Sequence, residues 1–150
     1  MRRLFSLIVG AALLLAGPLA AQDTERYGLQ RVAYHINSNG GDENRYYYAS
    51  MRNVQNHINA VGAENLEVAV VMHGNGLGLL AEALDDTQLQ TVISSLKGQG
   101  VTFVVCANTL RGREISYEDD LYDVWEEDIV PSGVAELSHL QAQGYTYIHP

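Results

Sequence analysis

Two short runs of this chain are almost entirely apolar and rich in β-branched residues. They are Leu66–Met72 and Val101–Val105. Such runs are typical of strands that are buried on both faces, as in a parallel sheet covered by helices. These two runs therefore favour an α/β fold over an all-helical or an all-β one.

Segments with helical periodicity lie between and beside these runs. From Asp42 to Val61, apolar residues recur every three or four positions and predict an amphipathic helix that ends at Gly62. Its predicted buried stripe is Tyr47, Met51, Val54, Ile58 and Val61. Thr87 and Gln90 are spaced as a capping box, which predicts a second helix that stops at Gly98.

Later segments repeat the alternation. Ser116 and Asp119 are also spaced as a capping box and predict a short acidic helix from Tyr117 to about Trp125. Ser132 is expected to cap a last helix that ends at Gly144. The remaining predicted strands are Leu29–Ile36, Ile129–Val130 and Tyr145–Ile148. Strands that alternate with helices predict one α/β domain with a mainly parallel sheet.

The N-terminus has the pattern of a secretory signal peptide. Met1-Arg2-Arg3 is basic, the run from Leu4 to Gly17 is uncharged, and small residues follow at Ala20 and Ala21. The run is short for a membrane-spanning helix. We therefore expect residues 1–21 to be a signal peptide and residues 22–150 to be a single periplasmic or secreted domain without stable membrane anchoring.

Composition restricts the partners and the chemistry. The formal net charge is −9, and removal of Arg2 and Arg3 with the signal peptide would change it to −11. Nucleic acid is therefore not an expected partner, because it requires a basic surface. The only cysteine, Cys106, cannot form an internal disulfide, so it is buried, paired between chains or kept as a working thiol. No Cys/His spacing indicates a metal site, and no cofactor is expected.

Functional sites of open parallel sheets lie at the carboxyl ends of the strands. Three segments are expected there, namely Asn37–Gly41, His73–Gly78 and Cys106–Arg113. If their strands are neighbours, His73 and Cys106 lie on the same edge. Free amides near Asn108 and Thr109 and the cation of Arg111 would then favour the thiolate.

Each of these residues also has a structural interpretation. Cys106 could be an inert core thiol, and His73 could be bonded to backbone rather than acting on the thiol. The loop from Gly74 and Asn75 to Gly78 lacks the spacing of a nucleotide-binding loop, which favours a tight turn with close backbone packing. His57, His139 and His149 are given no role.

Three segments together resemble the DsrE/DsrF-like family of sulfur-relay proteins. They are F-V-V-C-A-N-T-L around Cys106, V-V-M-H-G-N-G-L around His73, and the closing V-P-S-G-V-A-E-L-x-x-L-Q-x-x-G-Y-x-Y-I-x-P. The resemblance runs from about Arg31 to Pro150 and implies a three-layer α/β/α sandwich with a five-stranded, mainly parallel sheet. It also implies homo-oligomers, either trimers or hexamers.

The resemblance implies that Cys106 carries sulfur as a persulfide and exchanges it with a sulfur donor or acceptor protein. His73 and Asn108 match recurrent pocket positions of the single-chain relatives. The resulting expectation is an exported sulfurtransferase or sulfur carrier. The alternative is a non-enzymatic module that binds a small ligand or mediates oligomer contacts, with Cys106 as an inert core residue.

Overall fold

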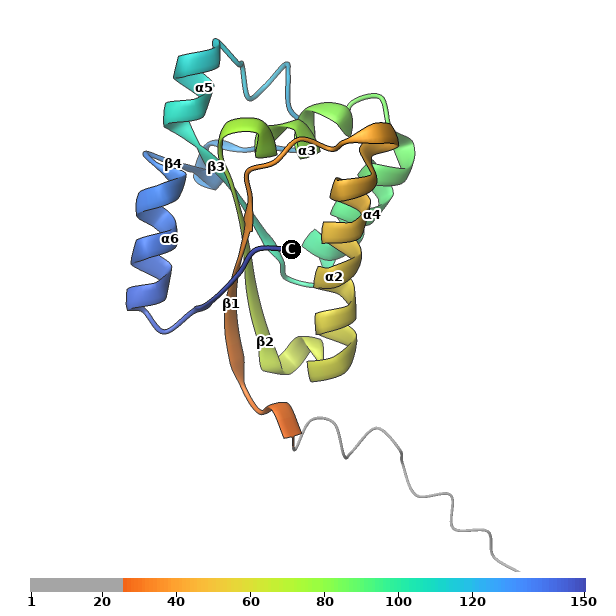
Figure 1. Cartoon of the computed structure of the whole chain (residues 1–150), viewed down its shortest axis with the longest axis vertical. Helices are drawn as coiled ribbons and strands as arrows, with labels where there is room; N and C mark the ends of the chain where they lie inside the picture. The colour runs from red at the N-terminus through yellow and green to blue at the C-terminus, as the bar shows by residue number, and fades with distance from the viewer. Residues whose placement is uncertain (1–25) are drawn as a thin grey trace, which may run out of the picture.

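The structure is a computed structural model that describes residues 26–150. Its centre is a sheet of five parallel strands in the order β4-β3-β2-β1-β5 (Figure 1). The strands are β1 (Gln30–Ile36), β2 (Leu66–Met72), β3 (Thr102–Cys106), β4 (Ile129–Val130) and β5 (Thr146–Ile148). The fold class expected from the sequence is therefore confirmed.

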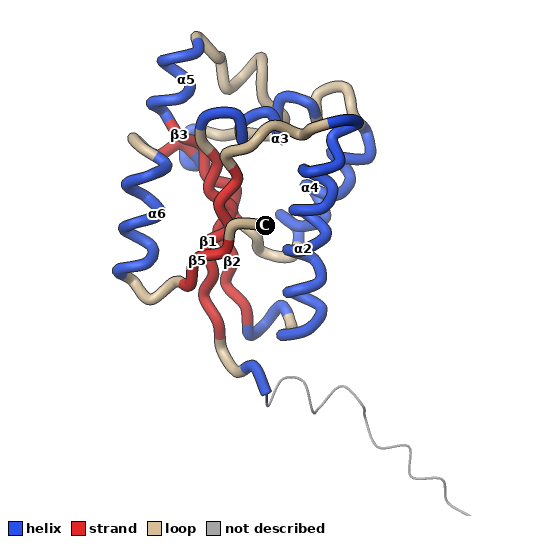
Figure 2. The backbone as a smooth tube through the Cα atoms, viewed as in Figure 1, coloured by secondary structure: helices blue, strands red, loops and turns tan. Residues whose placement is uncertain are grey.

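Helices cover both faces of this sheet (Figure 2). One face carries α2 (Arg45–Val61), α3 (Gly78–Glu82) and α4 (Thr87–Gly98), and the other carries α6 (Gly133–Ala142). Helix α5 (Ala107–Arg113) follows β3 at the carboxyl edge. Short 3-10 helices are η1 (Asp42–Asn44), η2 (Ala63–Asn65), η3 (Gly74–Leu77) and η4 (Glu126–Asp128).

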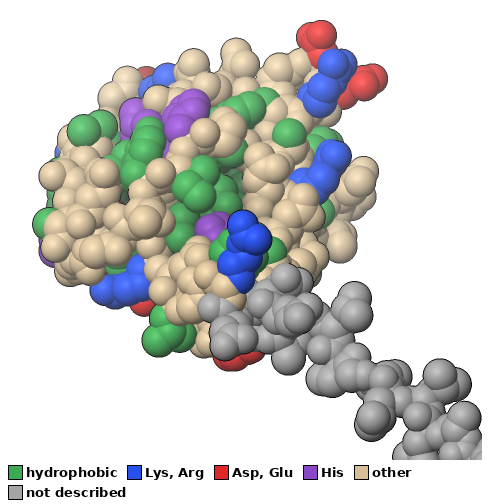
Figure 3. All heavy atoms as spheres, turned by 60° about the horizontal axis from the view of Figure 1, so that its bottom comes forward, with side chains coloured by type: hydrophobic (Ala, Val, Ile, Leu, Met, Phe, Trp, Pro, Cys, Tyr) green, Lys and Arg blue, Asp and Glu red, His purple; other side chains and the backbone are tan. Residues whose placement is uncertain are grey.

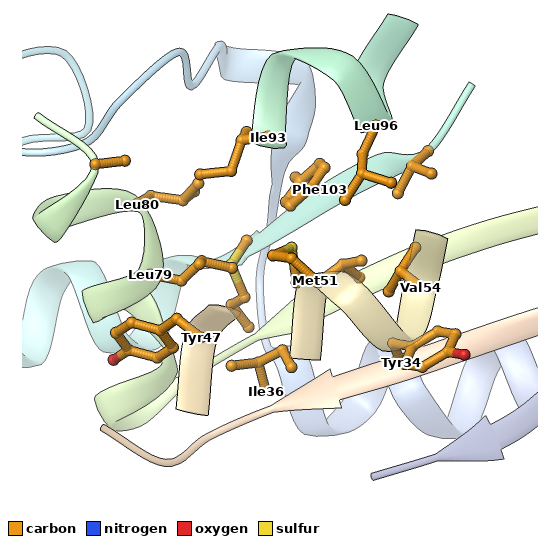
Figure 4. Close-up of a cluster of buried hydrophobic side chains, with 14 of the residues drawn as sticks. Tyr34, Ile36, Tyr47, Met51, Val54, Leu79, Leu80, Ile93, Leu96 and Phe103 are labelled. Atoms are coloured by element: carbon orange, nitrogen blue, oxygen red, sulfur yellow. The ribbon is translucent and has the colours of Figure 1, made fainter. Parts of the chain in front are cut away.

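The main hydrophobic core lies between the sheet and the helices α2, α3 and α4 (Figure 4). Alternate strand residues such as Tyr34, Ile36 and Phe103 point into it, as the period of two in a strand requires. All five residues of the predicted α2 stripe are buried. Helical spacing alone was thus sufficient to identify the face of α2 that packs on the sheet.

The other face of the sheet holds a smaller apolar cluster under α6. Its members are Ala33, Ala69, Val71, Leu137, Leu140 and Tyr145. The small side chains of Ala33 and Ala69 allow α6 to pack close to the centre of the sheet. Because strand residues alternate in direction, His35 lies on this α6 face, two positions beyond Ala33.

Four local predictions were wrong or incomplete. The cap of α4 is Asp86, whose Oδ1 accepts from the amides of Gln88 and Leu89, each at 3.1 Å; Thr87 is already helical. The segment after Cys106, for which no helix was predicted, forms α5. The loop predicted after His73 is the 3-10 helix η3, and α3 follows it from Gly78.

The predicted acidic helix does not form. The Ser116 hydroxyl accepts from the Asp119 amide at 3.3 Å, so the capping contact is present, but the chain continues as turns. Asp123 adopts φ 54°, which an α-helix does not allow. Repulsion between Asp119 and Asp123, four residues apart, also disfavours a helix here.

The predicted signal peptide lies outside the described residues. Within residues 26–150, no helix combines the length and the apolar character needed to cross a bilayer.

Figure 3 shows Lys and Arg side chains in separate small groups on the face in view, without one broad basic surface.

Candidate functional site at the carboxyl edge of the sheet

Cys106 is the last residue of β3 and directly precedes α5. It is a free thiol with 4% of its surface exposed. Strand alternation places it on the α6 face of the sheet, opposite the main core that holds Val105. The thiol is therefore covered by protein but lies at the edge where parallel sheets carry their sites.

Neutral polar groups near the sulfur influence its ionisation. Burial by itself raises the pKa of the Cys106 thiol, because it disfavours the charged form. The backbone amide of Gly133, the hydroxyl and amide of Thr109 and the amide of Asn108 outweigh that effect and lower the pKa below its usual 9.0. The site therefore favours a thiolate through neutral donors, without a cation beside the sulfur.

Thr109 also joins two of the predicted segments. Its Oγ1 accepts a hydrogen bond from the backbone amide of Gly74 at 2.9 Å. The loop after β2 is thus fixed to the first turn of α5 by the same hydroxyl that faces the thiol. The sequence predicts that Thr109 and Gly74 lie at the same edge of the sheet, but no sequence pattern indicates the hydrogen bond between them.

Gly133, the first residue of α6, packs between His73 and Cys106. A Cβ atom at residue 133 would lie 3.2 Å from the Cβ of His73 and 3.3 Å from the Cβ of Cys106. Real side chains rarely pack so tightly, so glycine lets α6 approach both residues at once. The structure therefore brings His73 and Cys106 to one point of the edge.

His73 is held by the sheet and by another histidine. Its backbone amide donates to Ile36 O at 3.3 Å, and its Nε2 lies 2.7 Å from Nε2 of His35. No hydrogen bond between His73 and Cys106 is present among residues 26–150. The His73 side chain thus bonds another side chain, while its main chain bonds the end of β1.

The histidine–tyrosine cluster consists of His35, His73, Tyr147 and His149. His35 Nδ1 lies 2.7 Å from the Tyr147 hydroxyl, and the His149 ring stands edge-on to His35 with 5.3 Å between centroids. Burial lowers the pKa of His35 to about 4, with smaller contributions from His73 and His149. Burial also lowers the pKa of His73. Both imidazoles are therefore neutral at neutral pH.

Sequence reasoning missed three members of this cluster. A usable signal existed for His35, because Val32, Tyr34 and Ile36 mark the core face of β1 and leave His35 on the other. No comparable signal existed for Tyr147 and His149. Their place depends on β5 pairing with β1, which lies more than a hundred residues away in the chain.

The predicted arginine does not face the thiol. Arg111 donates from Nη2 to the Asn108 side-chain oxygen, and Arg113 donates from Nη2 to Asn75 Oδ1 at 2.8 Å. Asn75 is further fixed through its carbonyl oxygen, which accepts from the Tyr47 hydroxyl at 2.9 Å. Arg111 thus binds an amide side chain of its own helix, and Arg113 binds one in the segment after β2.

The loop after His73 packs closely against the end of β1. A Cβ atom on Gly76 would lie 1.9 Å from the carbonyl oxygen of Ile36, so backbone approaches backbone there as the tight-turn interpretation predicted. Within residues 26–150, no group of three or more His, Cys, Asp or Glu side chains is arranged to hold a metal ion.

Comparison with known proteins agrees with this fold. The family model of the DsrE/DsrF-like family matches residues 31–150. A solved structure of a protein of unknown function, MTH1491 from Methanobacterium thermoautotrophicum, is similar with a TM-score of 0.66 and 31% identity; the match covers 81% of this chain and 99% of that one. No curated protein matches significantly. The chain belongs to the DsrE/DsrF-like family.

Proposed function

We propose that this protein is an exported sulfur carrier in which Cys106 accepts a sulfane sulfur and holds it as a persulfide. Membership in the DsrE/DsrF-like family suggests a role related to sulfur relay. The finer proposal depends on the surroundings of Cys106. The observation that carries it is the position of this lone thiol at the carboxyl end of β3, packed against Gly133. Neutral groups of Gly133, Thr109 and Asn108 also lower the pKa of the thiol despite burial.

Hydrogen-bond donors near the sulfur would assist both the formation and the storage of a persulfide. The thiolate is the attacking form, so a lowered pKa increases the reactive fraction at neutral pH. The product also carries a negative charge on its outer sulfur, which hydrogen-bond donors stabilise. Because the donors are amides and a hydroxyl, the site can hold this charge without forming a tight ion pair that would have to break on transfer.

The proposed step is a simple displacement. With thiosulfate as donor, the Cys106 thiolate attacks the outer sulfur, a sulfur–sulfur bond forms, and the bond to the sulfonate sulfur breaks. Sulfite leaves with the electron pair of the broken bond, so no further oxidant or reductant is needed. Transfer to an acceptor thiolate repeats the displacement at the outer sulfur and regenerates the Cys106 thiolate.

The remaining parts of the proposal concern the setting. We propose a periplasmic or secreted protein, because of the N-terminal signal pattern, and a homotrimer or homohexamer, because of the family. A separate donor or acceptor protein would bring sulfur to the site and remove it. His73 acts beside the thiol as a base or as an orienting group.

The direct test is sulfur loading of the exported protein. The protein is incubated with thiosulfate or polysulfide, and its intact mass is measured by mass spectrometry. Since Cys106 is the only cysteine, a single added sulfur atom reports on that residue. We expect an adduct that a reductant removes and that Cys106→Ser abolishes. The absence of an adduct, while a known persulfide carrier loads in parallel, would contradict the proposal.

A ligand-binding module is the second candidate, and one observation favours it. A cavity of about 590 Å³ lies between α2 and α4, with Met51 and Val92 among its apolar lining and Arg45 and Arg52 among its charged lining. It does not include Cys106. Under this alternative Cys106 is inert, so the folded protein should resist alkylation and Cys106→Ala should leave ligand binding intact.

A further inference from the structure

We propose that Tyr147, His35 and His73 form a proton relay between solvent and the thiol side of the site. In this relay Tyr147 and His35 are positioning residues, because they decide which nitrogen of His73 carries a proton. The inference rests on the proposed function of Cys106 and adds to it the groups that move the proton of the thiol.

The directions of the hydrogen bonds in the cluster are coupled. A contact of 2.7 Å between Nε2 of His35 and Nε2 of His73 requires that one nitrogen donates and the other accepts. A neutral imidazole has one proton on its two nitrogens. If His35 donates from Nε2, its Nδ1 must accept from the Tyr147 hydroxyl; if Nε2 accepts, Nδ1 must donate to the Tyr147 oxygen.

The two arrangements give His73 opposite properties. In the first, Nε2 of His73 accepts from His35, so its Nδ1 carries the proton and can donate. In the second, Nε2 of His73 donates, so its Nδ1 is unprotonated and basic. Within residues 26–150, no hydrogen bond involves Nδ1 of His73. This nitrogen is therefore unpaired within those residues, and the relay assigns to it the exchange of a proton with the thiol on the other side of Gly133, through a bridging water.

One concerted shift links the two arrangements and balances all protons. Nδ1 of His73 takes the thiol proton, Nε2 of His73 passes its own proton to Nε2 of His35, and Nδ1 of His35 passes one to the Tyr147 oxygen. Tyr147 releases its hydroxyl proton to water. The thiol has lost one proton, solvent has gained one, and the three relay residues remain neutral. The reverse shift returns a proton to a leaving group.

Solvent exposure increases along the relay from the thiol to Tyr147, as a path for protons to solvent requires. The side of Cys106 is covered, His35 is 8% exposed, and Tyr147 is 45% exposed. A buried thiol exchanges protons with bulk water slowly unless a connected path exists. Gly133 lies between His73 and Cys106 and packs against both, and the half-exposed Tyr147 ends the path at the solvent side.

The groups facing the relay keep it uncharged. His35 comes from β1, His73 follows β2, Tyr147 comes from β5 and His149 follows β5. Helix α6 contributes Gly133, Leu137 and Leu140 to this side, none of which titrates. Burial lowers the pKa of both His35 and His73, and the neighbouring histidines lower that of His35 further. A neutral pair is the state that the relay needs.

The first test measures tautomers by nitrogen NMR of the imidazoles. Tyr147→Phe keeps the ring and removes the hydroxyl at the far end. We expect the proportion of the two His73 tautomers to change in this variant, because His35 loses its bond to residue 147. His139→Gln, on the exposed side of α6, is the control and should leave His73 unchanged. An identical His73 tautomer in Tyr147→Phe and wild type overturns the relay.

The second test is the pH dependence of the reaction at Cys106. We expect Tyr147→Phe and His35→Gln to load sulfur from thiosulfate about tenfold more slowly at neutral pH, since positioned proton transfer contributes at least this much. The deficit should disappear at high pH, where hydroxide removes the thiol proton. A deficit of the same factor at every pH, or no deficit, overturns the relay and leaves a packing role.

Alkylation separates the failure of the relay from the failure of the sulfur carrier. A small neutral alkylating reagent reacts with the Cys106 thiolate whether or not the protein handles sulfur. If wild type does not load sulfur but its alkylation shows the same variant-specific, pH-dependent deficit, the carrier proposal fails and the relay holds. If sulfur loads and both variants match wild type at all pH values, the relay fails and the carrier proposal holds.

Discussion

Removing one hydroxyl group tests how the protein stabilises the Cys106 thiolate. Thr109→Val replaces the hydroxyl with a methyl group of similar size and keeps the backbone amides of Gly133, Thr109 and Asn108 in place. The hydroxyl is one of the donors that lower the thiol pKa, and it also accepts from the Gly74 amide. The variant therefore loses one donor to the sulfur and one bond between α5 and the loop after β2.

The size of the effect follows from the charge on the acceptor. A hydrogen bond to an ionised group contributes about 1.5 kcal/mol or more. Because about 1.4 kcal/mol corresponds to a factor of ten, the thiolate fraction below the thiol pKa should fall about tenfold. The lost bond to Gly74 should lower the free energy of unfolding by about 1 kcal/mol, because a neutral pair is worth less.

The assay is the rate of alkylation of the folded protein as a function of pH. Each curve is divided by its own plateau at high pH, which removes differences in access to the buried sulfur. Thr109→Ser keeps the hydroxyl and is the matched control, so its curve should follow wild type. The reasoning is refuted if the normalised curves of Thr109→Val and wild type superimpose, because the hydroxyl would then contribute nothing to thiol ionisation.

Three further predictions concern stability, each measured by urea unfolding. Gly76→Ala should lower the free energy of unfolding by about 3 kcal/mol, because its Cβ would lie 1.9 Å from the Ile36 carbonyl oxygen. The control Gly98→Ala, whose Cβ would have nothing within 4 Å, should be neutral or stabilising. Equal effects of the two substitutions would refute this reasoning. Asp86→Ala removes the cap of α4 and should cost about 1 kcal/mol, a value near zero being the contrary result. His35 has a folded pKa of about 4, below the 6.5 of the unfolded chain, so the unfolded state binds more protons between these values. The free energy of unfolding therefore falls as pH drops through this range, by about 3 kcal/mol for this residue. His35→Gln should reduce the difference in stability between pH 7 and pH 4.5, and an unchanged difference would count against the assignment.

The sheet and its main core could be predicted because their signals are local. Each pattern lies within one short stretch of sequence, as in the apolar run of β2 and the spacing of Tyr47, Met51 and Val54 on α2. The order of the strands is different, because β5 pairs with β1 through Val32 and Thr146. No local pattern encodes a contact over that separation, so the cluster that depends on it could not be read from the sequence.

Short elements were missed for a related reason. Helix α5 has seven residues and buries only Leu110, so it has no periodic stripe that a sequence could display. The acidic segment had the opposite problem, because its start signal at Ser116 is real but the following residues do not sustain a helix. The sequence could place Cys106 and His73 at the same edge of the sheet because both stand at the carboxyl ends of parallel strands.

The pairing of β5 with β1 also has a consequence for the order in which the molecule can be assembled. The bond between His35 and Tyr147 joins residues 112 positions apart, and β5 is an edge strand with a register of three residues. Long-range closures of this kind are made late during folding. A folding chain can therefore form β1 to β3 and their core while the tyrosine is still absent from the edge. During refolding, the time at which the β5 amides become protected from hydrogen exchange can be compared with the time for the core strands. Later protection of β5 would show that the site is completed after the core.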